Sequence, residues 1–126
     1  MEDKLIEFET AKLASEAGYD ITPDWVYDTD GILSTFGSFI GDDEIFAPTQ
    51  SLLQRWLREV HNINIFMSHK PNIKKWDFIP TDLTLNGKDW VKAYNEYYKT
   101  RKSRSYDTYE EALEAGLQEA LKLIKT

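Results

Sequence analysis

Apolar residues recur at helical spacing in an early part of the chain, between residues 7 and 17. Ala11, Leu13, Ala14 and Ala17 fall on one side of a helix drawn over this range. Gly18 follows at the position where a left-handed residue ends many helices. The pattern therefore predicts a first helix over residues 7–17.

A second helical pattern begins after Pro48. Thr49 is suited to cap the free N–H groups of the first turn, and His61 with Asn62 is suited to end the helix. We expect the buried face to consist of Leu52, Leu53, Trp56, Leu57 and Val60. We expect the exposed face to carry Gln54, Arg55, Arg58 and Glu59.

Short strand patterns lie between and after these helices. The turn signal Asp28-Thr29-Asp30-Gly31 separates apolar segments and predicts an irregular hairpin with strands near 25–28 and 32–36. A half-buried strand is predicted where Ile63, Ile65 and Met67 alternate with Asn64, Phe66 and Ser68. A further strand near 76–79 should end at Pro80 or lie at a sheet edge, because proline lacks an N–H.

The last helix is predicted over residues 108–124. Thr108 and Glu111 form a capping box, and Leu113, Leu117, Leu121 and Ile124 make the apolar stripe. Ala112, Gly116 and Ala120 lie beside the stripe at intervals of four. Because glycine costs about 1 kcal/mol relative to alanine in a helix, this line of small residues predicts a close neighbour. That neighbour is either another element of the same chain or a second copy, which would make a homodimer.

The order of elements predicts an α+β fold, with three main helices packed on a small, mostly antiparallel sheet in one domain covering 1–126. Two segments are less defined. Asn86-Gly87 signals a turn, and residues 89–99 fit a helical stripe although their tyrosines also favour a strand. We favour the helix.

Composition narrows the class of protein. The 126 residues are 41% hydrophobic, which is enough for a core, and include no cysteine. Zinc ribbons, thiol nucleophiles and iron–sulfur ligation by cysteine are excluded, and a reducing compartment is favoured. We expect no membrane span and no signal peptide, and hence a cytoplasmic protein.

The net charge of −7 is unevenly distributed. Residues 1–47 hold 12 acidic and 2 basic side chains, whereas residues 48–106 hold 5 acidic and 11 basic ones. We expect most of this difference to be absorbed by internal pairing. The alternative is a surface with two differently charged faces.

Motifs for catalysis or cofactor binding are not apparent in the sequence. His61 and His69 are the only histidines and do not have ligand spacing, and there is no nucleophile elbow, phosphate-binding loop or complete calcium loop. We therefore expect a protein that is not an enzyme and has no cofactor and no metal.

The basic segment 99–104 is flanked by Tyr97, Tyr98 and Tyr106. Cations beside aromatic rings suit phosphate neutralisation and base stacking. Nucleic-acid binding through residues 97–106 is thus an alternative, with these candidate contacts: Lys99, Arg101, Lys102 and Arg104. The overall acidity opposes it, and a solvated loop explains the same residues.

Three stretches resemble a family of short proteins of gut Bacteroidetes and of their phages and prophages. They begin APTQSLLQRWLREVH at Ala47, YDTYEEALEAGL at Tyr106 and ETAKLA at Glu9. The resemblance implies an origin in a mobile element. It carries no activity, ligand or catalytic residue.

The leading hypothesis is a non-enzymatic module that binds a protein. The candidate contacts are polar residues of the second helix that core packing does not require: Gln50, Arg55, Arg58 and His61. A further alternative is an acidic inhibitor that imitates DNA through residues 20–44.

Overall fold

The computed structural model describes residues 3–37, 44–83 and 105–124. Its helices are α1 (Phe8–Glu16), α2 (Gln50–Val60) and α4 (Tyr109–Leu123). Its strands are β1 (Trp25–Tyr27), β2 (Leu33–Thr35), β3 (Ile45–Phe46), β4 (Ile63–Lys70) and β5 (Lys75–Asp82). The predictions for Asn86-Gly87, residues 89–99 and the basic segment 99–104 fall outside the described residues.

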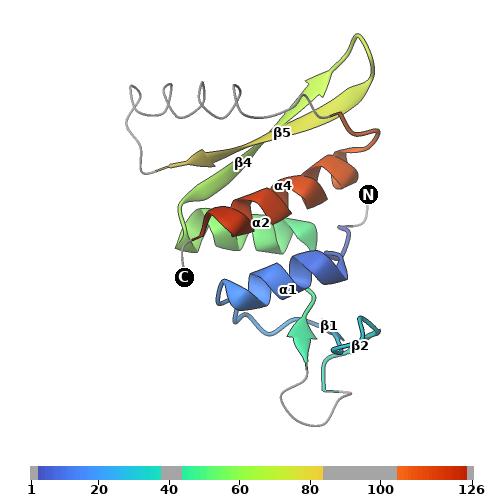
Figure 1. Ribbon diagram of the computed structural model, residues 1–126, viewed down its shortest axis with the longest axis vertical. Helices are drawn as coiled ribbons and strands as arrows, with labels where there is room; N and C mark the ends of the chain where they lie inside the picture. Colours follow the sequence, from blue (N-terminus) through green and yellow to red (C-terminus); the bar gives the residue numbers. More distant parts are fainter. Residues whose placement is uncertain (1–2, 38–43, 84–104, 125–126) are drawn as a thin grey trace.

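These elements confirm the α+β class, but they form two antiparallel sheets where one was expected. One sheet has the strand order β2-β1-β3 and the other is the β4–β5 hairpin. Figure 1 shows the three helices lying between them, with the hairpin on one side and the small sheet on the other. Helix α4 is the central helix, since it contacts α1, α2 and both strands of the hairpin.

Helix α1 ends as its sequence predicts. Gly18 has a φ of 93°, and its N–H and that of Tyr19 bond to the carbonyls of Ser15 and Ala14. The left-handed turn directs Tyr19 inward, where it is buried with its ring centroid 5.2 Å from that of Trp56. The cap thus joins α1 to α2.

Helix α2 begins at its predicted cap, but its buried face is displaced. The Thr49 hydroxyl accepts a bond from the Leu52 N–H, and Asn62 ends the helix region with a φ of 57°. Leu53, Trp56 and Leu57 are buried as expected, with Gln50 buried alongside them. The prediction that Leu52 and Val60 are buried is wrong, because Leu52 is 48% exposed and Val60 is 57% exposed. Leu52 lies at the border of the buried stripe, and Val60 is the last residue of the helix.

The β4–β5 hairpin forms one side of the hydrophobic core. Ile63 and Ile65 on β4 and Phe78 on β5 are buried in one cluster with the leucines of α2 and α4. Strand β5 does not end at Pro80, which pairs with Ile65. The other alternative, a strand at a sheet edge, is confirmed, because both strands of a two-stranded sheet are edges.

The line of small residues on α4 packs against the hairpin. A Cβ atom at Gly116 would lie 2.9 Å from Cγ2 of Ile65 and 3.1 Å from Cγ of Phe78. Ala112 and Ala120 are fully buried within the chain. The close neighbour is therefore internal, and the alternative of a homodimer through Ala112, Gly116 and Ala120 has no exposed surface there.

Candidate functional site

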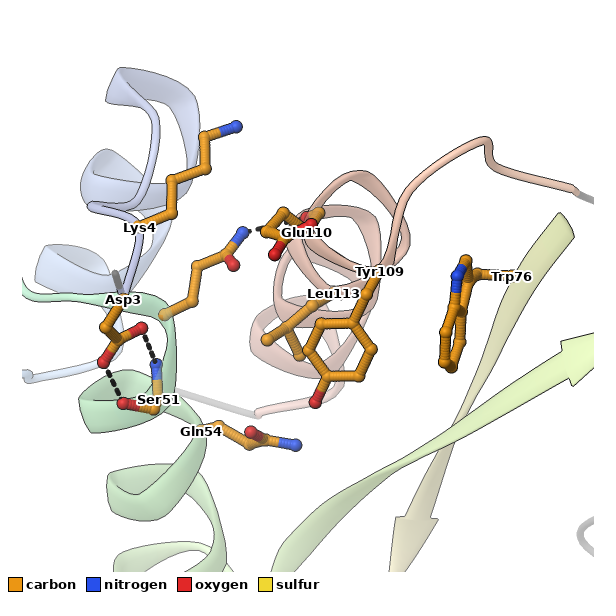
Figure 2. Close-up of a pocket in the computed structure, with 9 residues that line it drawn as sticks. Asp3, Lys4, Ser51, Gln54, Trp76, Tyr109, Glu110 and Leu113 are labelled. Carbon is orange, nitrogen blue, oxygen red and sulfur yellow. Dashed lines mark hydrogen bonds between the residues drawn. The ribbon is translucent and has the colours of Figure 1, made fainter. Parts of the chain in front are cut away.

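A cleft of about 480 Å³ opens where the first turns of α2 and α4 meet the start of β5. Figure 2 shows residues of the amino-terminal segment and α2 on one side and residues of α4 and β5 on the other. The lining residues are Asp3, Lys4, Gln50, Ser51, Gln54, Trp76, Tyr109, Glu110 and Leu113. The cleft thus combines segments from both ends of the chain.

One wall of the cleft is aromatic and apolar. The rings of Trp76 and Tyr109 lie edge to face, with centroids 5.2 Å apart and planes at 89°. Trp76 is fixed further by its backbone, whose N–H and carbonyl both bond to Tyr106 at 2.8 and 2.9 Å. Leu113 is buried beneath them. The wall is therefore held in place by the fold before any ligand arrives.

The opposite wall is polar and is tied to the N-terminus of α2. The chain around Leu5 pairs with Thr49, and the Gln50 N–H bonds to the Lys4 carbonyl at 2.7 Å. The Asp3 carboxylate accepts bonds from the hydroxyl and the N–H of Ser51. Burial raises the pKa of Asp3, but these bonds and one from Thr49 outweigh it and leave the pKa below its usual value.

Charges at the rim of the cleft are mainly negative. Asp3 and Glu110 contribute carboxylates, and Lys4 contributes an ammonium group whose Nζ lies 3.8 Å from Glu7. Gln54 adds an amide that reaches the Ile65 carbonyl at 3.5 Å. The rim can therefore hydrogen-bond a peptide backbone and attract a cation.

Within residues 3–37, 44–83 and 105–124, no three His, Asp or Glu side chains come together as a possible metal site. The cleft combines one apolar wall with one polar wall, a combination that ligand pockets in other proteins share.

The expectation that Gln50 lies on the exposed side of α2 is wrong, whereas its role as a protein contact stays a prediction. Its side chain is 2% exposed and donates to the Glu110 carbonyl and to Oε1 of Glu114, each at 2.9 Å. The other carboxylate oxygen of Glu114 accepts bonds from the Glu7 N–H at 2.9 Å and from the Thr10 hydroxyl. Gln50 is thus part of a buried network that joins α1, α2 and α4, and only its edge reaches the cleft.

The other three residues predicted on α2 have different environments. Arg55 and Arg58 are exposed, and Nε of Arg55 lies 3.0 Å from Oε1 of Glu59. His61 is half-buried, with its ring centroid 4.7 Å from that of Trp56. None of the three lines the cleft.

Replacing His61 with leucine should raise the free energy of unfolding by about 1 kcal/mol, because a buried polar atom without a partner costs about 1–3 kcal/mol. Nε2 of His61 is buried and has no hydrogen-bond partner among the residues that the structure describes. The backbone bond that caps α2, from the His61 N–H to the Leu57 carbonyl, does not depend on the side chain. Urea unfolding measures the change, and a loss of stability would show that the imidazole is satisfied in solution.

The structure describes only part of the two alternative sites, residues 97–106 and residues 20–44. Lys99, Arg101, Lys102 and Arg104 lie outside the described ranges, so nucleic-acid binding through them stays a prediction. In the acidic region, Oδ1 of Asp28 accepts bonds from the N–H groups of Asp30 and Ile32, both at 2.9 Å. At least this carboxylate shapes the β1–β2 turn.

The cleft itself was not predicted from the sequence. Trp76, Tyr109 and Ser51 are far apart along the chain, and each has an ordinary role in its own element. The one available signal was Tyr109 in the first turn of a helix, where a large aromatic residue outside the apolar stripe is not required by the core.

No family model, curated protein or solved structure matches the chain. In the part of the chain that the structure describes, no helix has the length and apolar character needed to cross a bilayer.

Proposed function

We propose that the chain is a non-enzymatic binding module that holds a segment of another protein in the cleft between α2, α4 and β5. The segment inserts one aromatic or long aliphatic side chain against Trp76, Tyr109 and Leu113. The observation that carries this proposal is the preformed aromatic wall facing a polar one across about 480 Å³. Pockets for small ligands or single anchoring groups have volumes of about 300–1,000 Å³.

The chemistry of the walls favours a peptide over a purely apolar ligand. Trp and Tyr are enriched among the residues that dominate protein interfaces, because they bury a large area and keep a polar group. Ser51 and Gln54 can bond the main chain of the segment. The carboxylates of Asp3 and Glu110 outnumber the ammonium group of Lys4, so we expect a lysine or arginine beside the anchor.

The setting of this module is also part of the proposal. Two of the stretches that resemble proteins of Bacteroidetes and their phages, at 47–61 and 106–117, contain six of the nine lining residues. We infer an origin in a mobile element and a role in the cytoplasm, which the absence of cysteine favours.

Tyr109→Ala should abolish the selection of peptides by the cleft. The expected result with the unaltered protein, in panning of a random peptide library, is a consensus with one aromatic or leucine anchor next to a basic residue. Loss of the Tyr109 ring should weaken binding of a consensus peptide at least tenfold, because interface anchors contribute about 2 kcal/mol or more. Titration followed by the indole N–H signal of Trp76 measures the affinity.

The matched control is Leu123→Ala, at the other end of the same helix. Leu123 is 57% exposed and lies about 20 Å along α4 from Tyr109. It should leave the consensus and the affinity unchanged. Absence of any consensus, or equal weakening by both variants, would contradict the proposed function.

A further inference from the structure

The turn between β4 and β5, with the residues that flank it, forms a basic hairpin tip, defined here as residues 69–76. Figure 1 shows this tip projecting beyond the helices. Lys70 and Lys75 are directly paired across the two strands, and Lys74 lies between them in the turn. Ile73 is 54% exposed at the end of the turn.

Several residues at the hairpin tip are unfavourable for the hairpin itself. Like charges directly opposite each other destabilise an antiparallel pair. Lys74 has a φ of 54°, a conformation that side chains other than glycine, asparagine and aspartate rarely adopt. Ile73 leaves apolar surface in water. Local costs without a structural gain are characteristic of functional sites.

The counterions of the hairpin tip differ in their exposure. Nζ of Lys70 lies 3.7 Å from a carboxylate oxygen of Asp77, whose side chain is 7% exposed, and Lys75 pairs with Asp107, whose side chain is 71% exposed. An exposed pair such as Lys75–Asp107 contributes about 0–1 kcal/mol. Lys74 forms no ion pair with another described residue. The ammonium groups of Lys74 and Lys75 can therefore bind stronger anions.

Among the described residues, the ion-pair partners of the lysines at the hairpin tip do not come from the acidic residues 1–47. Lys70 and Lys75 form their ion pairs with Asp77 and Asp107. The internal pairing of residues 1–47 with residues 48–106 stays a prediction, because most bases of the second range lie outside the described residues. Glu110 and Glu111 lie in the first turn of α4, whose N-terminus balances negative charge.

We propose that the hairpin tip binds the phosphate backbone of double-stranded DNA and enters its major groove. A two-stranded ribbon fits the major groove, and lysines on either side of a turn can reach phosphates along its edges. Ile73 at the end of the turn is suited to contact thymine methyl groups. Lys70, Ile73, Lys74 and Lys75 do not line the peptide cleft. On the proposed function, the protein therefore joins DNA to a protein partner.

The test is binding of a fluorescent 20-base-pair duplex at 50 mM salt, measured by anisotropy. We expect Lys74→Gln combined with Lys75→Gln to weaken binding at least tenfold and to reduce the salt dependence by about two counterions, one for each lost lysine. The matched control, Lys12→Gln with Lys122→Gln, removes the same net charge away from the hairpin and should change binding less than twofold.

A separate variant distinguishes a functional cost from damage to the fold. Lys74→Gly suits the left-handed turn, so it should raise the thermal stability while it weakens DNA binding. No binding to the duplex, equal losses in the matched pair, or stronger binding to anionic vesicles or an acidic protein would overturn the proposal. Tyr109→Ala should leave DNA binding intact, so this inference and the proposed function can fail separately.

Discussion

Glu114→Ala should lower the free energy of unfolding by about 3 kcal/mol, because a buried donor that loses its acceptor costs about 1–3 kcal/mol. Glu114 is 5% exposed, and its two carboxylate oxygens accept bonds from Gln50, Thr10 and the Glu7 N–H. Alanine removes an acceptor from all three donors, of which Nε2 of Gln50 keeps its bond to the Glu110 carbonyl. Because small domains are stable by only about 5–15 kcal/mol, urea unfolding should show a much lower midpoint.

The control for this prediction is Glu16→Ala, which removes the same charge from an exposed position on α1 and should change stability by less than about 0.5 kcal/mol.

A second readout of the Glu114→Ala variant is the pKa of the Tyr27 phenol. Burial raises its pKa above 10.0, and the charges of Glu114 and Glu7 add to the shift. In the variant the pKa of Tyr27 should fall toward its ordinary value. A pKa left unchanged, or a loss of stability matched by Glu16→Ala, would contradict the network.

Gly116→Val should destabilise the protein by about 3 kcal/mol, at the upper end of what overpacking a core costs. The Cβ alone would lie 2.9 Å from a methyl group of Ile65 and 3.1–3.2 Å from the Phe78 ring. Both neighbours are buried, and the methyl is on a β-branched side chain with little freedom to move. Gly116→Ala should also be destabilising, although alanine favours a helix by about 1 kcal/mol.

A double-mutant cycle separates steric conflict from a general intolerance of the site. Ile65→Ala removes the methyl nearest to Gly116. We expect Gly116→Ala to cost less in the Ile65→Ala background than in the unaltered protein, with a coupling of about 1 kcal/mol in urea unfolding. If the stability costs of Gly116→Ala and Ile65→Ala were strictly additive, the steric conflict at Gly116 would not involve Ile65.

Features that depend on one residue's own chemistry could be predicted from the sequence. Thr49 and Thr108 cap α2 and α4 with their hydroxyl groups, and Gly18 and Asn62 adopt the left-handed conformation. Each forms within a few residues of chain, so no knowledge of the tertiary fold is needed. The helix bounds accordingly lie within one residue of those expected.

Features that depend on tertiary contacts between elements could not be predicted from the sequence. Helical spacing predicted that one face of α2 is buried, but it did not predict exactly which residues form that face. Packing against α4 and the bond to Glu114 bury Gln50, and Leu52 is left exposed. Strand β3 has only two residues, too few to show alternation, and it forms because β1 offers a free edge. The cleft was missed for the same reason, since Trp76 and Tyr109 meet only through tertiary packing.

The buried carboxylate of Glu114 also bears on the order of events during synthesis. It connects α4 to α1 across 104–107 positions of the chain, and α4 fills the centre of the core. A nascent chain that ends before α4 has left the ribosome exposes the hairpin face and leaves α1 and α2 without their common partner. Closing so long a loop comes late and slowly in folding. A nascent chain at that stage therefore exposes apolar surface that α4 covers in the folded protein.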